Sequence, residues 1–301
     1  MSDVTASDRS FTSTVAREVL DKACDLVGLR ADDASLIRFG SNAIFELRGT
    51  PVVVRVGRSP ERMPVFEREL CVARWLADHD VPTVRPYDGV EHPLDVNGHP
   101  VSFWHRVESA DPPPGAADLA RLLRGFHAAG DSPCELPTLD PLGDVPARLA
   151  AARGIADEDL DFLRGRAEEL HRRYGELTFE LPAGPLHGDA YVGNLLGRPG
   201  AAVLLDYESA AVGPREWDLT PVAVAHRRLG LPDRDNAAFT EAYGHDVTAW
   251  AGFPVLAGIR EVTMTTWLMQ NVGEGQHLAD EFRLRVRSLR DGDDTATWHA
   301  F

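Results

Sequence analysis

The stretch "LHGDAYVGNLLGRPGAAVLLDYE", Leu186 to Glu208, places a histidine, two aspartates and an asparagine around two short apolar strands joined by the turn sequence Arg-Pro-Gly-Ala. In such a hairpin Asn194 lies roughly opposite Asp206, and opposed residues have Cβ atoms about 4.5–5.5 Å apart. Two oxygen ligands at that separation can share one hard cation such as Mg²⁺. Asp189 belongs to the loop that leads into the hairpin, so we expect it to face the same point.

These residue types suit phosphoryl transfer. A carboxylate beside a metal-bound phosphate can take a proton from a substrate hydroxyl or orient it. A metal between Asn194 and Asp206 can hold the charge that develops on the phosphate. Asp or Asn alone beside a turn is usually a local cap, so the joint pattern His-Gly-Asp-x-x-x-x-Asn, followed by a hairpin that ends in Asp, carries the prediction.

The composition excludes some function classes. The chain has 301 residues, of which 44% are hydrophobic, and a formal net charge of -16, which argues against nucleic acid as a partner because phosphate binding needs a basic surface. Such a charge fits solubility alone or a cationic ligand. Lys22 is the single lysine and lies outside any Gly-Lys-Ser/Thr sequence, so a Walker-type phosphate loop is excluded.

The cysteines and the apolar runs indicate the compartment. Cys24, Cys71 and Cys134 are few and widely spaced, so we expect neither a disulfide framework nor a zinc site. A reducing cytoplasm is then the natural compartment. The first ten residues lack the pattern of a signal peptide, and no apolar run approaches the roughly 18 residues of a membrane span. We therefore expect a cytoplasmic protein without membrane association.

The sequence "DPPPG", residues 111–115, is the sharpest break in the chain, because three prolines continue neither a helix nor a central strand. The strands predicted before it cover residues 35–40, 43–49, 52–57, 84–90 and 101–107, and the helices there cover 12–29 and 59–80, the second with Ser59 as its cap. The helices predicted after the break cover residues 116–130, 157–175, 215–230 and 256–272. The pattern predicts an α+β protein with a small strand-rich lobe, residues 1–107, and a larger, mainly helical lobe, residues 108–301.

The segment "HGDAYVGN" resembles the catalytic loop of the aminoglycoside phosphotransferase family, and "LLDYESAAVGPREWDL" resembles that family's metal-binding segment and its continuation. The resemblance runs from about residue 36 to 270 and is specific only over 187–219. It implies a bilobal protein-kinase-like fold, with Asp189 as catalytic base and with Asn194 and Asp206 as Mg²⁺ ligands. It further implies that Asp218 is a buried aspartate that accepts hydrogen bonds from the catalytic loop, and that His187 is structural.

A kinase-like fold needs a positive charge on a strand, paired with a helix glutamate, to hold the α- and β-phosphates. Arg55 lies in the middle of "VVVRVG", and Glu69 in the next helix is the best matching partner, ahead of Glu67. The family usually has lysine where Arg55 stands, and the two side chains are not interchangeable. Either Arg55 holds the phosphates in a variant of the site, or nucleotide binding is weakened.

Two further segments match the expected nucleotide site. Ser41 and Asn42, in "RFGSNAIFEL", lie where the family covers the phosphates, and main-chain groups from His105 to Val107 lie where it binds adenine. The acceptor is expected between the catalytic loop and the helices of the second lobe. The acceptor-site candidates are Glu208, Trp267, Gln270, Asn271 and Glu274, three of them at i, i+3, i+4 spacing on one predicted helix.

Together these features predict an ATP- or GTP-dependent small-molecule kinase that requires Mg²⁺. It would transfer the γ-phosphoryl group to a hydroxyl of an aminoglycoside, a sugar or a related small metabolite, since fold and motif do not choose among these. One alternative is a non-catalytic nucleotide- or small-molecule-binding protein on the same scaffold, which Arg55 suggests. The other alternative, a metal-dependent hydrolase that uses His187, Asp189 and Asp206, leaves Asn194 unexplained.

Overall fold

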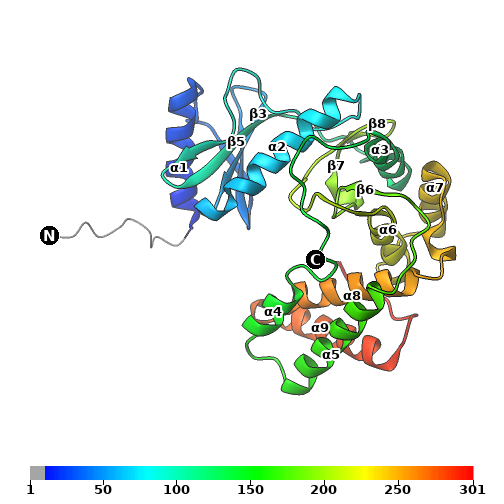
Figure 1. Ribbon diagram of the computed structural model, residues 1–301. Coiled ribbons are helices and arrows are strands. Elements are labelled where there is room, and N and C mark those ends of the chain that lie inside the picture. The colour runs from blue at the N-terminus through cyan, green and yellow to red at the C-terminus, as the bar shows by residue number, and fades with distance from the viewer. Residues whose placement is uncertain (1–10, 301) are drawn as a thin grey trace. The chain divides into compact units, whose positions relative to one another are not determined.

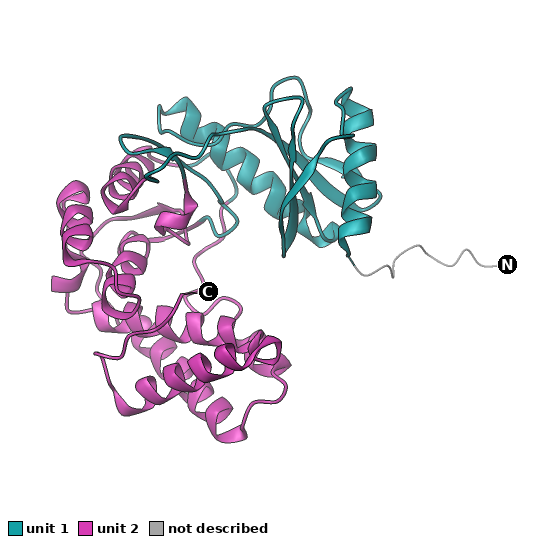
Figure 2. Ribbon diagram, turned by 180° about the vertical axis from the view of Figure 1, so that it is seen from behind, with its two compact units in different colours: residues 1–113, 132–135, 196–210 teal, residues 114–131, 136–195, 211–301 magenta. Residues whose placement is uncertain are grey.

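The computed structural model describes residues 11–300, and its chain forms two compact units (Figures 1 and 2). Unit 1 comprises the chain as far as residue 113 together with residues 132–135 and 196–210. Unit 2 comprises residues 114–131, 136–195 and 211 onward. The predicted boundary at residue 107 assigned the segment 196–210 to the second lobe, whereas the contacts within the chain assign it to the strand-rich unit. Among the described residues, no helix has the length and apolarity to cross a membrane.

Unit 1 is built on one antiparallel five-stranded sheet in the order β1-β2-β3-β5-β4. Its strands are β1 (Ser35–Phe39), β2 (Asn42–Leu47), β3 (Val52–Gly57), β4 (Leu94–Val96) and β5 (His99–His105). Alternate residues of a strand face opposite sides of its sheet. In β3 the valines 52, 54 and 56 are fully buried in the main core of the unit, so Arg55 is directed to the other face.

One helix packs on each face of this sheet (Figure 1). Helix α1 (Ser13–Val27) begins at its cap Thr12, ends at Gly28 in the left-handed region, and buries Val19 and Leu20 in the core with the valines of β3. Helix α2 (Met63–Asp78) contacts β5 and carries Phe66 and Glu69 to the face that holds Arg55. The alternation of β3 therefore sends its single charge toward α2.

A disulfide joins Cys71 of α2 to Cys134. This bond brings residues 132–135 into unit 1. The wide spacing of the cysteines led us to expect no disulfide framework, and this single bond was not foreseen, because residues far apart in sequence are brought together by the fold. Cys24 is free and buried in α1.

The predicted hairpin is present as the two-stranded sheet of β7 (Leu195–Arg198) and β8 (Ala201–Leu204). Residues 196–210 belong to unit 1, where Val84 donates a backbone hydrogen bond to Leu204 and Leu204 donates one to Pro82. Asp206 follows β8 with φ of +69°. An aspartate tolerates this left-handed conformation better than most residues, and its presence beside a functional motif is typical of a constrained site.

Unit 2 is mainly helical, with the small sheet of β6 (Ala183–Leu186) and β9 (Ala211–Pro214). Its helices are α3 (Ala116–Ala128), α4 (Val145–Ala151), α5 (Asp157–Tyr174), α6 (Glu216–Arg228), α7 (Asp233–Tyr243), α8 (Phe253–Met269) and α9 (Gln276–Asp291). Helix α8 packs against α4, α5, α6 and α9, and α3 packs against α7. Helix α8 is therefore the central helix of this unit.

A buried cluster of charged residues in unit 2 surrounds Trp298, which is 2% exposed. The guanidinium groups of Arg228 and Arg285 lie 4.9 and 5.0 Å from its ring, and its backbone N–H donates to the carbonyl of Arg228. Glu261 and Glu281 pair with the two arginines. Because each of these arginines has an opposite charge and an aromatic ring beside it, the cluster is satisfied within the unit.

Three predicted elements differ from the structure. Residues 84–90 are not a strand, because the chain turns at Asp88 and Gly89, directly after a single bridge from Pro86 to Trp104. The helix expected from Ser59 begins as a short 3₁₀ turn, Pro60–Arg62, and becomes α-helical at Met63. Helix α8 ends at Met269, so the residues that follow it do not continue the predicted helical spacing.

Candidate active site

The loop after β6 is fixed by one buried carboxylate. Asp218, in the first turn of α6, is fully buried and accepts hydrogen bonds from the backbone N–H of His187 at 2.8 Å and of Gly188 at 2.9 Å. Burial opposes ionisation of Asp218, but the hydrogen bond and charge of His127, the charge of His187 and the bond from Gly188 lower the pKa of its carboxyl below the usual value. The loop is thus bound to a carboxylate that stays ionised.

Asp218 is supported in turn by neighbouring helices. Nε2 of His127, on α3, lies 3.0 Å from Oδ2 of Asp218, and Nδ1 of the same ring lies 2.8 Å from the hydroxyl of Tyr243. Trp217 donates its indole N–H to the carbonyl of Gly188 at 2.9 Å. Sequence reasoning did not identify His127; its place in an apolar helical stripe gave no sign of a polar partner.

Asp189 follows this anchored segment, and its side chain is 39% exposed. Nη1 of Arg260, on α8, lies 2.8 Å from Oδ1 of Asp189. Asn194 is buried, and its side-chain N–H donates to the backbone carbonyl of Asp189 at 2.9 Å. The side-chain oxygen of Asn194 is therefore the atom suited to bind a cation.

Arg55 and Glu69 form a buried ion pair in unit 1. Nη1 of Arg55 lies 2.5 Å from Oε1 of Glu69, and the two side chains are 11% and 3% exposed. The guanidinium also lies 5.0 Å from the centroid of the Phe66 ring. Burial raises the pKa of Glu69, and the charge of Asp206 adds to this, while the charge of Arg55 opposes it.

Glu208 gathers a further set of donors in the same unit. Its carboxylate pairs with Arg55, with Nη2 of Arg62 at 2.6 Å, and with the side-chain amide of Asn42 at 2.7 Å. Arg68 donates to its backbone carbonyl at 2.6 Å. The sequence indicated Glu208 as an acceptor-site residue, whereas two of its neighbours in unit 1, Arg55 and Asn42, are residues expected around the nucleotide.

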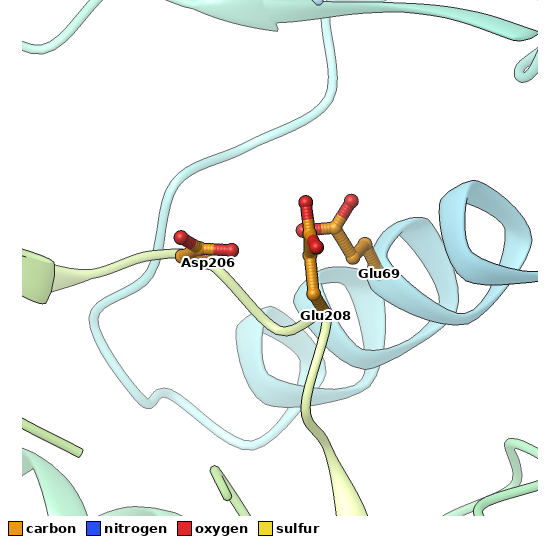
Figure 3. A group of neighbouring side chains, drawn as sticks. All are labelled: Glu69, Asp206 and Glu208. Carbon is orange, nitrogen blue, oxygen red and sulfur yellow. The ribbon is translucent and has the colours of Figure 1, made fainter. Parts of the chain in front are cut away.

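The carboxylates of Glu69, Asp206 and Glu208 approach one another in unit 1, with ligand atoms within 4.8 Å (Figure 3). Oxygen donors of this kind suit a hard divalent cation such as Mg²⁺, so the residues present fit a metal ion. The oxygens of Glu69 and Glu208 also bind arginines, and Asp206 is the member of the group that the sequence motif assigned to the metal. Asn194 belongs to unit 2, so its sharing of one ion with Asp206 stays a prediction.

The other predicted site residues are distributed over both units. Ser41 is exposed beside the buried Asn42. The backbone N–H groups of His105 and Arg106 already donate to Arg85 and Pro51, so Val107 is the better candidate to meet a base. Among the acceptor-site candidates of unit 2, Trp267 lies on α8, Gln270 caps it, Asn271 follows it and Glu274 ends the next short 3₁₀ turn.

A kinase-like phosphotransferase requires an aspartate presented by an anchored loop. It also requires a pair of a basic residue and a glutamate near metal-binding carboxylates, and both features are present here. Residues 37–258 match the family model described as the phosphotransferase enzyme family, APH. Because this match spans more than half of the chain, the chain belongs to that family. It is a small-molecule kinase with an α+β kinase-like fold, and its acceptor group is a hydroxyl. The hydrolase alternative gains no support from this family.

Solved structures share the fold over nearly the whole chain. The amicoumacin kinase hAmiN, in complex with AMP-PNP, Ca²⁺ and Ami, is 14% identical with a TM-score of 0.73, over 94% of this chain and 96% of that one. Choline kinase LicA from Streptococcus pneumoniae is 13% identical with a TM-score of 0.64, over 91% and 98%. The spectinomycin phosphotransferase APH(9)-Ia, in complex with ADP and spectinomycin, is 12% identical with a TM-score of 0.62, over 91% and 93%.

Proposed function

We propose that the chain transfers the γ-phosphoryl group of ATP or GTP, with Mg²⁺, to a hydroxyl of an aminoglycoside, a sugar or a related small metabolite. The similar structures include one with AMP-PNP, one with ADP and one with GDP, which supports both donor nucleotides. The proposed reaction involves neither a membrane nor a nucleic acid. We place the reaction in the cytoplasm, where nucleotide triphosphate is available and where the Cys71–Cys134 bond would be largely reduced.

The position of Asp189 on an anchored loop, with its side chain exposed, is the observation that carries the proposal. Its backbone neighbours are held by the buried Asp218, while its own side chain is exposed enough to meet a substrate. A carboxylate held in this way can accept the proton of an attacking hydroxyl or orient that hydroxyl toward the phosphorus. The anchoring keeps the catalytic group in one geometry, which is how positioning contributes to the rate. His187 and Asp218 support the loop and do not touch the substrate.

We assign the donor nucleotide to the residues of unit 1. Arg55 binds the phosphates and is oriented by Glu69, to which it is already paired. Asn42 and Ser41 cover the phosphates with side-chain and backbone donors, and Val107 meets the base. The forked guanidinium matches phosphate oxygens in pairs, which a lysine cannot do.

Asn194 and Asp206 would hold the Mg²⁺ ion, as the resemblance of the motif implies. When bound, such an ion neutralises the phosphate charge that grows during transfer. Asp206 contributes a carboxylate oxygen fixed by its left-handed backbone conformation. Asn194 contributes an amide oxygen whose partner nitrogen is already bound to Asp189.

A non-catalytic binding protein is the second candidate; the contacts of Arg55 favour it, whereas the membership of the chain in a phosphotransferase enzyme family opposes it. Arg55 pairs through Nη1 with Glu69 and through Nη2 with Glu208, so both of its terminal nitrogens are engaged by the chain itself. A nucleotide must displace Glu208 before it can use these donors. If it does not, the scaffold binds a small molecule without transferring phosphate.

Asp189→Asn tests the proposal, with Asp233→Asn as the control because Asp233 is fully exposed on α7. A mass-spectrometric screen with ATP and GTP would cover aminoglycosides, sugars and amino alcohols, and titration would measure nucleotide affinity. We expect Asp189→Asn to lower turnover by at least 1,000-fold while the nucleotide Kd changes less than threefold. Turnover unchanged in this variant contradicts the assignment of Asp189, and nucleotide binding without any product supports the second candidate.

A further inference from the structure

The contacts of Asp189 bear on the chemistry of the acceptor. Resting on the proposed function, we infer that the acceptor carries an anionic group close to the hydroxyl that is phosphorylated, and that Arg260 binds that group. Arg260 was not among the residues selected from the sequence. All the residues used in this argument belong to unit 2.

Arg260 contacts the group that must receive the acceptor hydroxyl. Its Nη1 lies 2.8 Å from Oδ1 of Asp189. A hydroxyl that reaches Asp189 therefore approaches a guanidinium at the same time. The atoms of the acceptor that neighbour this hydroxyl are then within reach of Arg260, because the guanidinium and the carboxylate are in contact.

Arg260 also has N–H donors that Asp189 does not engage. A guanidinium carries five N–H donors, and over residues 11–300 the structure gives Arg260 one ion-pair partner, Asp189. Its side chain is 24% exposed. Arg228 on α6 shows the contrast, since it is 1% exposed and bonds Glu261 and the carbonyls of Asp293 and Ala296. The donors of Arg228 are engaged by groups of its own unit, whereas Arg260 can bind a second anion.

The face of α8 that carries Arg260 has no acid that would offset this charge. Trp267 lies seven residues further on, which is about 20° from the direction of Arg260 around the helix, and it is 46% exposed. Thr263 and Met264 lie between them on the same side. The neighbouring Glu261 is buried and is paired with Arg227 and Arg228. Along this face the next exposed side chain is therefore the aromatic ring of Trp267, and Asn271 follows it.

These charges disfavour a polycationic acceptor at Asp189. The charge of Asp189 is already balanced by Arg260, so the carboxylate attracts an ammonium group less, and the guanidinium repels it. An anionic group forms a charge-assisted, bidentate contact with the guanidinium. The net charge of -16 favours cations over the whole surface, but contact at a few ångströms decides which acceptor is bound. We infer a hydroxy acid, such as an acidic sugar, in preference to an aminoglycoside.

Two sets of matched compounds test this inference. Glucuronate, glucose and glucosamine share one ring, and gluconate, sorbitol and glucamine share one chain, with an anionic, a neutral and a cationic group in each set. Binding would be measured by saturation-transfer NMR and turnover by mass spectrometry with MgATP. The variants are Arg260→Gln, Arg260→Lys and the control Arg164→Gln, since Arg164 is exposed on α5 and pairs only locally with Asp161.

We expect the anionic member of at least one set to bind best to the wild-type protein. Arg260→Gln should weaken that preference at least tenfold, mainly through KM where turnover is seen, while Arg260→Lys keeps part of it and Arg164→Gln all of it. Preference for the cationic member, a preference unchanged in Arg260→Gln, or binding of no compound overturns the inference. Anion binding that depends on Arg260 without phosphate transfer supports the inference and contradicts the proposed function instead.

Discussion

Arg55 shows how one residue decides the chemistry of its surroundings. Its place in β3 sends it to the face of α2, where Glu69 and Glu208 both bind it. A lysine would supply one compact charge at this position, whereas a guanidinium can contact two carboxylates at once. The arginine and Glu208 therefore form a matched arrangement, in which the site holds more acid than a single lysine would balance.

Arg55→Gln should lower the free energy of unfolding by about 3–5 kcal/mol, since it leaves Glu69 buried without its partner. We expect the nucleotide Kd to rise at least tenfold, with Arg55→Lys between this variant and the wild type. Chemical denaturation and nucleotide titration measure the two effects. An Arg55→Gln variant with wild-type stability would show that Glu69 is protonated or otherwise paired at neutral pH.

The raised pKa of Glu69 predicts that the stability of the protein depends on pH. Its pKa in the folded protein is raised above the ordinary value of 4.5, first by burial. A raised pKa means that the folded state binds the proton more tightly, so the contribution of Glu69 to stability is greatest below pH 4.5 and falls as the pH rises through the folded pKa. The stability of the wild type relative to Glu69→Gln should therefore decrease as the pH rises over this window. Urea denaturation at several pH values measures it, and a relative stability that increases with pH would contradict the raised pKa.

The catalytic loop is the element in which backbone and buried charge act together. Gly188 adopts φ of +86°, a conformation that favours glycine. It lies between His187 and Asp189, and its N–H and carbonyl both have partners on α6. The sequence His-Gly-Asp therefore serves the backbone as well as the chemistry. The turn that exposes Asp189 depends on the positive φ of Gly188.

Asp218→Asn should weaken this loop, because the amide replaces a charged acceptor of two backbone N–H groups. We expect about 3 kcal/mol less stability and at least tenfold lower kcat, with nucleotide Kd little changed. Trp217→Phe is the matched control, because it removes the bond to the carbonyl of Gly188 while Asp218 still accepts both backbone N–H groups, and the lost bond should cost about 1 kcal/mol. Equal effects in the two variants would contradict the anchoring role of Asp218.

The sequence predicted those elements whose pattern is local. The alternation of β3, the helical stripe of α1 and the turn of the β7–β8 hairpin each follow from neighbouring residues. The strand expected at residues 84–90 was wrong, since the chain turns at Asp88 and Gly89, directly after the single bridge of Pro86. The partners that complete the site come from distant segments. Arg260 meets Asp189 only because α8 packs in the centre of its unit, and no local spacing reveals this.

The whole molecule combines segments that are distant along the chain, and the disulfide is one example. Cys71 and Cys134 are 63 residues apart in sequence and both belong to unit 1. Cys24 is buried, and burial, followed by the charges of Asp21 and Asp25, raises the pKa of its thiol to about 12. Its thiolate is therefore scarce at neutral pH, and its reactivity is low.

Thiol titration with Ellman's reagent should find no reactive cysteine in the folded, oxidised protein. It should find one after unfolding in denaturant and three after unfolding with a reductant. Reduction should also lower the free energy of unfolding by about 4 kcal/mol, from the chain entropy released by a loop of this length. Three reactive thiols in the unfolded protein without reductant would contradict the pairing.

The cluster around Trp298 has a consequence for biosynthesis. Arg228 and Arg285 are buried against this indole ring, yet the ribosome adds residue 298 long after residue 228. A nascent chain that stops short of the tryptophan leaves two guanidinium groups without the surface that covers them. Truncated products should therefore stay incompletely folded and be removed by cellular proteases, so that the helical unit matures only once its late segment has been translated.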